Sequence, residues 1–239
     1  MPVLLDPPIP ESFPTELQSG DRLSQREFHE IYSRMPGHIR AELIGGIVHM
    51  ASPMKRRHGT NTAPLASLFL GYENATPGTE SGENLTVVLN DANEPQPDVC
   101  LRVLPGYGGQ SINTVDDYIG GAPELVGEVA LSSRTADLSA KKKEYAAAGV
   151  REYLVLDLRD RQLHWFDLKS DHEQFADSDG IIRIGTFPGL WIDAAAVISR
   201  NQRGILATLD LGLASPEHAD FVRLLADRKR AIDETKAAT

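Results

Sequence analysis

The sequence predicts an α/β fold in which helices cover a β-sheet. The clearest observation is residues 125–155, where an apolar strand is followed by a polar turn, a lysine-rich helix and a second apolar strand. A strand, a helix and a strand of these lengths indicate a right-handed parallel crossover. The length of the chain is consistent with such a fold, because 239 residues, 41% of them apolar, can bury one substantial core. One domain with extensions therefore fits better than two equal domains.

The N-terminal part of the chain predicts an arm, a short helix and a hairpin. Residues 1–20 are rich in proline, which favours an extended arm over a helix or a central strand. Residues 24–27 form a capping-box pattern that predicts a helix running to about Met35. Two short apolar runs around a Gly-Gly pair predict a tight hairpin over residues 41–50, with Glu42 on its first strand.

The middle of the chain predicts a helix, two strands and a long loop. Apolar residues predict a helix over residues 63–70 that ends before Gly71. Residues 85–89 and 97–103 predict strands. The glycine- and aspartate-rich residues 105–121 predict a mobile loop.

The strand, helix and strand unit contains one acid in its first strand. Side chains alternate between two faces along residues 125–131, and Glu128 shares its face with apolar neighbours. Asp137 is a plausible cap for a helix that stops at Gly149. Residues 153–158 then predict a buried strand.

The last third of the chain predicts shorter elements and a final helix. Residues 163–168 predict a strand, and residues 181–184 and 187–192 predict two closing segments. Ser215, followed by proline, predicts the start of an amphipathic helix. This helix could pack on the domain or on another subunit.

Charge and composition exclude several classes of function. The formal charge of −10 argues against a protein whose whole surface binds nucleic acid or anionic lipid. A nucleic-acid role therefore needs a local basic cleft or a metal. The single cysteine, Cys100, excludes an internal disulfide framework and a cysteine-based zinc site. With no run of transmembrane length and no signal-peptide pattern, we expect a cytoplasmic protein.

Two carboxylates on interrupted apolar strands are the first candidate site residues. Glu128 lies in a run that should be fully buried, and a buried carboxylate is costly unless it has a partner. If the strand with Asp98 is a neighbour, the two carboxylates converge. At ~4 Å and an effective dielectric of about 20, two such charges repel by roughly 4 kcal/mol, so they need a proton or a cation. Mg²⁺ is the simplest answer. Alternatively, one acid is exposed or caps a neighbouring element.

A lysine on the following helix is the second candidate. At about 100° per residue, Lys141 falls near the centre of the apolar face that includes Leu138 and Tyr145. Lys143 points away from that face. An ammonium group beside the strand that carries Glu128 suits a partner such as an acid or a phosphate. The alternative is a lysine at the edge of the helix whose head group reaches solvent.

Four stretches of the sequence carry a family pattern. They are AELIGG at 41–46 with MASP at 50–53 and HG at 58–59; QPDV at 96–99; GAPELVGEVA at 121–130; and residues 137–153, from Asp137 through Tyr145 to GVREY. Together they resemble the Uma-type family of putative restriction endonucleases, a branch of the PD-(D/E)XK nuclease superfamily. The resemblance spans about residues 22–192 in the family's order.

The resemblance implies a restriction-endonuclease-like core, a central mixed β-sheet flanked by helices, with a Mg²⁺ site where the core strands diverge. The chain then divides into three parts, which are a proline-rich arm at 1–20, a nuclease-like domain at 21–193 that carries the resemblance, and a C-terminal helical extension at 194–239.

The resemblance further implies roles for individual residues. Asp98 matches the family's metal-binding aspartate, and Glu128 matches the acid of the (D/E)XK element. Glu42 resembles the accessory acid from the first part of the fold. Ala130 stands where the superfamily usually has lysine, and Lys141 matches the lysine that this branch carries on the next helix.

Two hypotheses for the function follow. The first is a Mg²⁺-dependent endonuclease for DNA, with Mn²⁺ as a substitute, in which Asp98, Glu128 and the carbonyl of Val129 hold the ion and Lys141 stabilises charge on the phosphate. Candidates for contacts to the DNA backbone are Lys55, Arg56, Arg57, His58 and Arg134. The second is a catalytically weak or inactive protein of the same fold that binds nucleic acid or protein, with a homodimer through the C-terminal helix as one arrangement.

Overall fold

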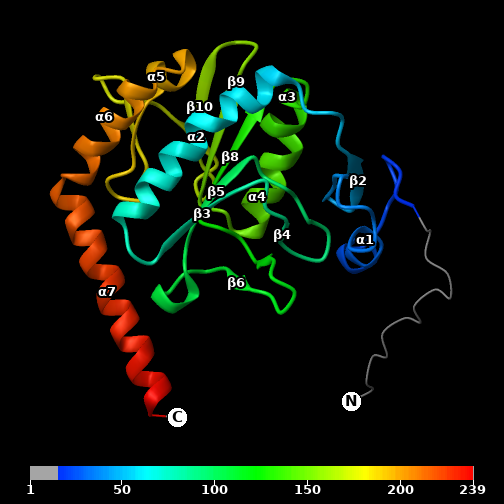
Figure 1. Ribbon diagram of the computed structural model, residues 1–239, viewed down its shortest axis with the longest axis horizontal. Helices are drawn as coiled ribbons and strands as arrows, with labels where there is room; N and C mark the ends of the chain where they lie inside the picture. The colour runs from blue at the N-terminus through cyan, green and yellow to red at the C-terminus, as the bar shows by residue number, and fades with distance from the viewer. Residues whose placement is uncertain (1–15, 239) are drawn as a thin grey trace.

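The chain folds into strands and helices that are packed in layers (Figure 1). This computed structural model describes residues 16–238. The described strands are β1 Ala41–Ile44, β2 Ile47–Met50, β3 Thr79–Glu83, β4 Val87–Val88, β5 Val99–Val103, β6 Ile112–Asn113, β7 Ile119–Gly120, β8 Leu125–Ala130, β9 Glu152–Asp157, β10 Gln162–Asp167, β11 His172–Gln174, β12 Ile181–Arg183 and β13 Trp191–Asp193. The described helices are α1 Gln25–Tyr32, α2 Arg56–Ala75, η1 Pro105–Tyr107, α3 Arg134–Ala136, η2 Asp137–Lys141, α4 Lys142–Ala148, α5 Ala194–Ser199, α6 Gln202–Leu213 and α7 Pro216–Ala237.

A six-stranded mixed sheet lies at the centre, in the order β11-β10-β9-β8-β5-β3. Within it β8 and β9 run parallel, and the other neighbouring strands are antiparallel. The parallel pair is the crossover that residues 125–155 predict. The predicted fold class, a mixed sheet flanked by helices, is therefore confirmed.

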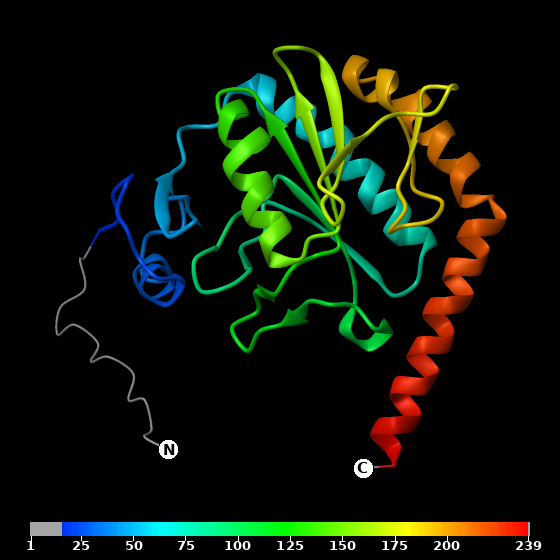
Figure 2. The ribbon, with the colours of Figure 1, turned by 180° about the vertical axis from the view of Figure 1, so that it is seen from behind.

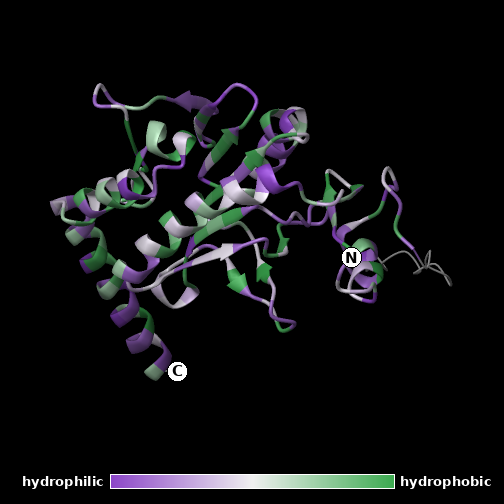
Figure 3. Ribbon diagram, turned by 45° about the horizontal axis from the view of Figure 1, so that its top comes forward, coloured by the Kyte–Doolittle hydropathy of each residue, from purple (hydrophilic) through white to green (hydrophobic). Residues whose placement is uncertain are grey.

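Helices cover both faces of the central sheet, α2 one face and α4 the other (Figures 1 and 2). Alternation along β8 divides its side chains between two cores. Val129 packs with Leu68 of α2 in the larger core, and Val126 packs with Tyr145 of α4 in the second. The central strands are mostly hydrophobic (Figure 3), as expected for strands that are buried on both faces.

The N-terminal segment places the strand that carries Glu42 beside the main domain. Ser24 caps α1 through a capping box, and β1 and β2 form the predicted hairpin. Asn93 joins this hairpin to the domain. Its side-chain oxygen accepts a hydrogen bond from the Gly45 N–H at 2.7 Å, and its side-chain nitrogen donates to Glu144 of α4 at 2.8 Å. Most of the predicted arm, at 1–15, lies outside the described residues.

We expect the Asn93→Ala substitution to lower the free energy of unfolding by about 1–3 kcal/mol, because it leaves buried polar groups without their hydrogen-bond partners. Asn93 is only 1% exposed. Urea denaturation monitored by circular dichroism measures the change. Asn74→Ala, at an exposed position of α2, is the matched control and should change stability little. Equal stabilities of the two variants would contradict the prediction.

Helix α2 begins earlier and ends later than the predicted range 63–70. Lys55 at its N-cap makes no side-chain capping bond, so the sequence carries no start signal. The predicted stop at Gly71 is wrong for a packing reason. A Cβ at this position would lie 2.9 Å from a side-chain carbon of Leu209 in α6, so the glycine permits a close helix contact.

The segment after β8 also differs from the prediction. The helix begins at Arg134, and Asp137 is not its cap. Asp137 instead starts a turn of π-helix that ends at Lys141, and its carboxylate accepts a hydrogen bond from Ser133. Gly149 ends the helix in the left-handed conformation, with φ of 96°, as predicted.

Other differences concern elements with weak sequence signals. The predicted strand at 85–89 is reduced to the two residues of β4, and the predicted loop at 105–121 contains η1, β6 and β7. The polar strand β3 (TESGE) is missed by the sequence, because its place is set by pairing with β5 rather than by an apolar pattern.

Helix α7 starts at the predicted cap, Ser215, and extends past the sheet (Figure 1). Its first half contributes Phe221 and Leu225 to the larger core, and most of its second half is exposed. A homodimer through this helix stays a prediction. No helix in the described part of the chain is long and apolar enough to span a membrane.

Candidate active site

Strand pairing brings the two predicted acids together. Val99 of β5 is opposite Gly127 of the antiparallel strand β8. Asp98 directly precedes β5, so the same register places it opposite Glu128. Both side chains are buried, with relative exposures of 7% for Asp98 and 4% for Glu128. The predicted convergence therefore rests on neighbouring antiparallel strands.

Lys141 supplies the positive charge at the centre of this cluster. Its ammonium nitrogen lies 3.0 Å from Glu128 Oε1, 3.0 Å from Glu42 Oε2 and 4.0 Å from Asp137 Oδ1. The side chain is buried, as the helical wheel predicts, and does not extend to solvent at the helix edge. One lysine thus bridges β1 and β8, whose acids are far apart in the sequence.

The carboxylate of Glu42 is held in the cluster by two hydrogen-bond donors. Its Oε1 accepts a hydrogen bond from the backbone N–H of Gln96 at 2.7 Å and a second from Lys141 at 3.1 Å. The isolated bridge between Leu43 and Glu94 runs beside this contact and joins β1 to the segment that leads to Asp98. The N-terminal hairpin is therefore part of the site.

Asp98 is oriented by two donors. Its Oδ2 accepts a hydrogen bond from the Val129 N–H at 2.7 Å and lies 3.2 Å from Nε2 of His58. The hydrogen bond from His58 to Asp98 raises the pKa of the imidazole, although partial burial acts in the opposite direction. The backbone of Val129 adds to the rise. These contacts fix one carboxylate oxygen of Asp98.

Burial sets the electrostatics of Glu128. Burial raises the pKa of its carboxyl well above the usual value, and the acids Asp98, Asp137 and Glu42 raise it further, while Lys141 acts in the opposite direction. The Tyr145 hydroxyl also donates a hydrogen bond to Glu128 Oε1 at 2.9 Å. Burial opposes the charge of Lys141, yet the surrounding carboxylates hold its pKa well above the usual value.

The residues present fit a hard divalent cation in their chemistry. Three carboxylates lie within 4.0 Å of the Lys141 ammonium, and a fourth, that of Asp98, acts on Glu128, so the cluster has an excess of negative charge that a cation would offset. Asp137 Oδ1 is buried and has no hydrogen-bond partner in the described structure. Among residues 16–238, no three His, Cys, Asp or Glu side chains are already grouped to hold a metal. Mg²⁺ needs only one or two protein carboxylates, since water and phosphate complete its shell.

The five predicted phosphate-contacting side chains lie in different surroundings. Lys55, Arg56 and Arg57 are exposed at the start of α2, and Arg57 donates a hydrogen bond to the carbonyl of Leu158. His58, in the same turn, faces Asp98 instead. Arg134 is paired with both Asp157 and Asp160, so its charge is already balanced within the protein.

Sequence reasoning missed two members of the cluster. The sequence pattern of Asp137 is typical of a helix cap, and that of Tyr145 is typical of an apolar residue on the helix face. The signal that could have found Asp137 is its spacing of four residues from Lys141, which places both on one side of a helix. No sequence signal indicates that the Tyr145 hydroxyl reaches Glu128.

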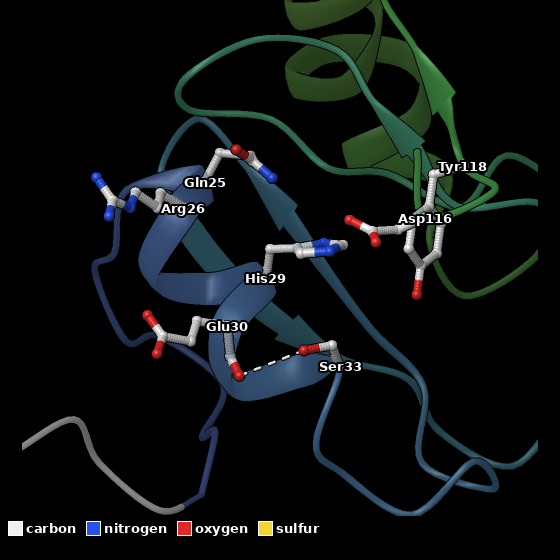
Figure 4. A pocket seen from close by; sticks show the side chains of 7 residues that line it. All are labelled: Gln25, Arg26, His29, Glu30, Ser33, Asp116 and Tyr118. Carbon is white, nitrogen blue, oxygen red and sulfur yellow. Dashed lines mark hydrogen bonds between the residues drawn. The ribbon is translucent and has the colours of Figure 1, made fainter. Parts of the chain in front are cut away.

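A separate open pocket of about 540 Å³ lies between α1 and the loop before β7 (Figure 4). Two of its lining residues, His29 and Tyr118, are in edge-to-face contact, with ring centroids 5.0 Å apart. Two of the lining residues also contact the buried carboxylate of Glu94, which accepts a hydrogen bond from Gln25 at 2.7 Å and lies 2.9 Å from His29. None of the predicted site residues lines this pocket.

We expect the imidazole of His58 in metal-free protein to titrate above its ordinary pKa of 6.5, because the Asp98 carboxylate favours its charged form. An NMR titration of the histidine side chains measures this value. Asp98→Asn should lower the His58 pKa, whereas Glu94→Gln should leave it unchanged. A His58 pKa that does not respond to Asp98→Asn would show that the two groups are not coupled.

The fold and the site together define a class. A mixed sheet with helices on both faces is the architecture predicted for a restriction-endonuclease-like core, and two acids lie on its adjacent antiparallel strands. The sequence profile of the Uma2 family, described as "Putative restriction endonuclease", matches residues 26–195. The chain belongs to this family.

A solved structure supports the same fold. A putative nuclease of the DUF820 group from Anabaena variabilis superposes with a TM-score of 0.58 at 12% sequence identity, over 71% of this chain and 96% of the other. At this identity the likeness concerns the fold alone. A comparison with functionally curated proteins finds no match.

Proposed function

We propose that this protein is a Mg²⁺-dependent endonuclease that hydrolyses phosphodiester bonds in DNA. The observation that carries the proposal is the cluster in which Glu42, Glu128 and Asp137 lie within 4.0 Å of the Lys141 ammonium, with Asp98 opposite Glu128 on the neighbouring strand. Keeping four neighbouring acids with a single lysine between three of them is costly for stability alone. Such a cluster suits a site that binds a cation and a phosphate.

Asp98 and Glu128, with the backbone carbonyl of Val129, would hold the Mg²⁺ ion or Mn²⁺ in its place. When bound, the ion supplies a water of lowered pKa and offsets charge on the phosphate. The chain's own residues position these groups. Val129 N–H and His58 fix Asp98, and Tyr145 fixes Glu128.

Lys141 has the role of stabilising charge that develops on the phosphate as water attacks in line. Its neighbours Glu42 and Glu128 keep it protonated. Because Ala130 occupies the usual lysine position at the end of β8, Lys141 is the cation that α4 and its preceding π-turn bring to the same place. Three carboxylates, those of Glu42, Glu128 and Asp137, lie within 4.0 Å of its nitrogen.

The experiment is a cleavage assay on plasmid, linear duplex and single-stranded DNA with Mg²⁺, with Mn²⁺ and with a chelator. We expect internal cleavage with either ion and none with the chelator. Calorimetry and thermal melting should show binding of the ion at millimolar concentration. Absence of cleavage together with absence of ion binding would overturn the proposal.

One observation favours a second candidate, a protein of the same fold that binds nucleic acid or protein with weak or no catalysis. Lys141 is already engaged by two carboxylates at 3.0 Å, and Ala130 provides no second ammonium. In that case DNA would bind without being cut in the assay above. A binding measurement beside the cleavage assay separates the two candidates.

A further inference from the structure

A second pocket lies next to the start of α2 and is lined by three arginines. It measures about 310 Å³ and is formed where the end of β9, the end of α5 and the first turns of α2 meet. Its arginines are Arg57 of α2, Arg161 of the turn after β9, and Arg200 at the end of α5. Asn61 and Ser199 add polar groups to the lining.

The three arginines have no acidic partner in the described part of the chain, within 4.0 Å of their side-chain nitrogens. Asp157 is the one acid that lines the pocket, and other groups already occupy it. Arg134 donates to its Oδ2, and the backbone N–H groups of Arg159 and Asp160 donate to its Oδ1. The pocket therefore has an excess of positive charge in a protein whose formal charge is −10.

Two consecutive residues of α2 connect the pocket with the carboxylate cluster. Arg57 lines the pocket, and His58 contacts Asp98. The pocket also adjoins the C-terminal end of β9, which is the parallel neighbour of the strand that carries Glu128. Arg57 is held at this position because it donates a hydrogen bond to the carbonyl of Leu158. A strand of nucleic acid bound at the cluster could continue into this pocket.

We propose that Arg57, Arg161 and Arg200 form a binding pocket for an internal phosphate of the nucleic-acid strand, beside the phosphate at the carboxylate cluster. This inference rests on the proposed nuclease function. Guanidinium groups are suited to it, because each presents several donors to phosphate oxygens, often two at once. Such contacts position a strand without reading its sequence. Arg57 donates a side-chain hydrogen bond to Leu158, whereas the side chains of Arg161 and Arg200 make none within residues 16–238, so these two are the residues to substitute.

The test compares the double variant Arg161→Gln/Arg200→Gln with the control Arg223→Gln/Arg230→Gln. The control removes the same charge from exposed positions of α7, away from the pocket. Both Arg161 and Arg200 have positive φ, 55° and 59°, and glutamine keeps a side chain there, so the backbone strain is unchanged. All proteins also carry Glu128→Gln, so that binding is measured at millimolar Mg²⁺ without cleavage.

Fluorescence anisotropy measures the affinity for a labelled oligonucleotide at several salt concentrations. The parent should bind, and the pocket variant should bind at least about tenfold more weakly. Its slope of log affinity against log salt should become shallower by about 0.7–0.9, as expected for the loss of one phosphate contact. The control should stay within about twofold of the parent.

Other results would either contradict the proposed phosphate pocket or separate it from the nuclease proposal. Equal affinity of the pocket variant and the control, or no binding by the parent, would overturn it. A loss seen only with oligonucleotides that carry a terminal phosphate would overturn the assignment to an internal phosphate. If the pocket variant weakens binding as expected while the protein with Glu128 intact never cleaves, the pocket stands and the nuclease proposal fails.

Discussion

Substituting Glu128 by Gln, or Asp98 by Asn, should reduce the rate of metal-dependent DNA cleavage by at least about 100-fold. Substituting a residue that only contacts a metal ligand already lowers activity or metal affinity by about 10–100-fold, and loss of a ligand itself should have a larger effect. Both substitutions keep the size of the side chain and one acceptor oxygen, so Tyr145 can still donate to position 128 and Val129 to position 98. What each removes is a negative charge. A rate loss would then report chemistry rather than misfolding.

Glu94→Gln is the matched control for this experiment. Glu94 is as deeply buried as Glu128, and burial raises the pKa of its carboxyl too. It contacts Gln25 and His29 of α1 and is not among the acids that contact Lys141. We expect Glu94→Gln to retain cleavage, with melting temperatures recorded for all three variants. Full activity in Glu128→Gln and Asp98→Asn would remove these residues from the mechanism.

The sequence was most informative where an acid interrupts an apolar strand. Glu128 stands out in β8 because its neighbours in the run are buried, and Asp98 stands out at the start of β5 for the same reason. Helical periodicity added the direction of Lys141. These inferences succeeded because buried strands and helix faces impose strong patterns on the sequence.

Tertiary contacts decided the parts that the sequence did not predict. Asp137 has the features of a helix cap, yet a π-turn carries it into the cluster. The start of α2 has no capping signal, and it is positioned by contacts of Arg57 and His58 with distant strands. The pocket of three arginines needs α5 and the turn after β9 to meet α2, and no local pattern encodes that meeting.

The substitution Lys141→Met should lower the free energy of unfolding by about 3–5 kcal/mol near neutral pH, because removing one partner of a buried ion pair leaves uncompensated charge. Lys141 is the ammonium shared by Glu42 and Glu128, and it is 9% exposed. Lys143→Met is the matched control, since Lys143 is exposed on the same helix. Chemical denaturation measures both, and equal losses would contradict the shared-ammonium arrangement.

The loss of stability caused by Lys141→Met should depend on pH in a defined direction. Without the lysine, the pKa of Glu128 rises further above its ordinary value of 4.5, because the ammonium that lowered it is gone. Between the unfolded and folded pKa values the folded protein then binds more protons than the unfolded chain, so its stability falls as pH rises. We therefore expect the deficit of Lys141→Met to be smaller at about pH 5 than at about pH 8.

A double substitution tests whether this deficit comes from the stranded carboxylate. Adding Glu128→Gln to Lys141→Met removes the buried charge that the first substitution leaves without a partner. Part of the lost stability should return, and the pH dependence should weaken, so the two substitutions will not be additive. Additive losses would mean that Lys141 stabilises the fold through its aliphatic packing, and that the charge of Glu128 is balanced by another group. Cleavage rates of the two single variants and the double variant separate stability from catalysis. The double variant should stay inactive even where its stability is restored.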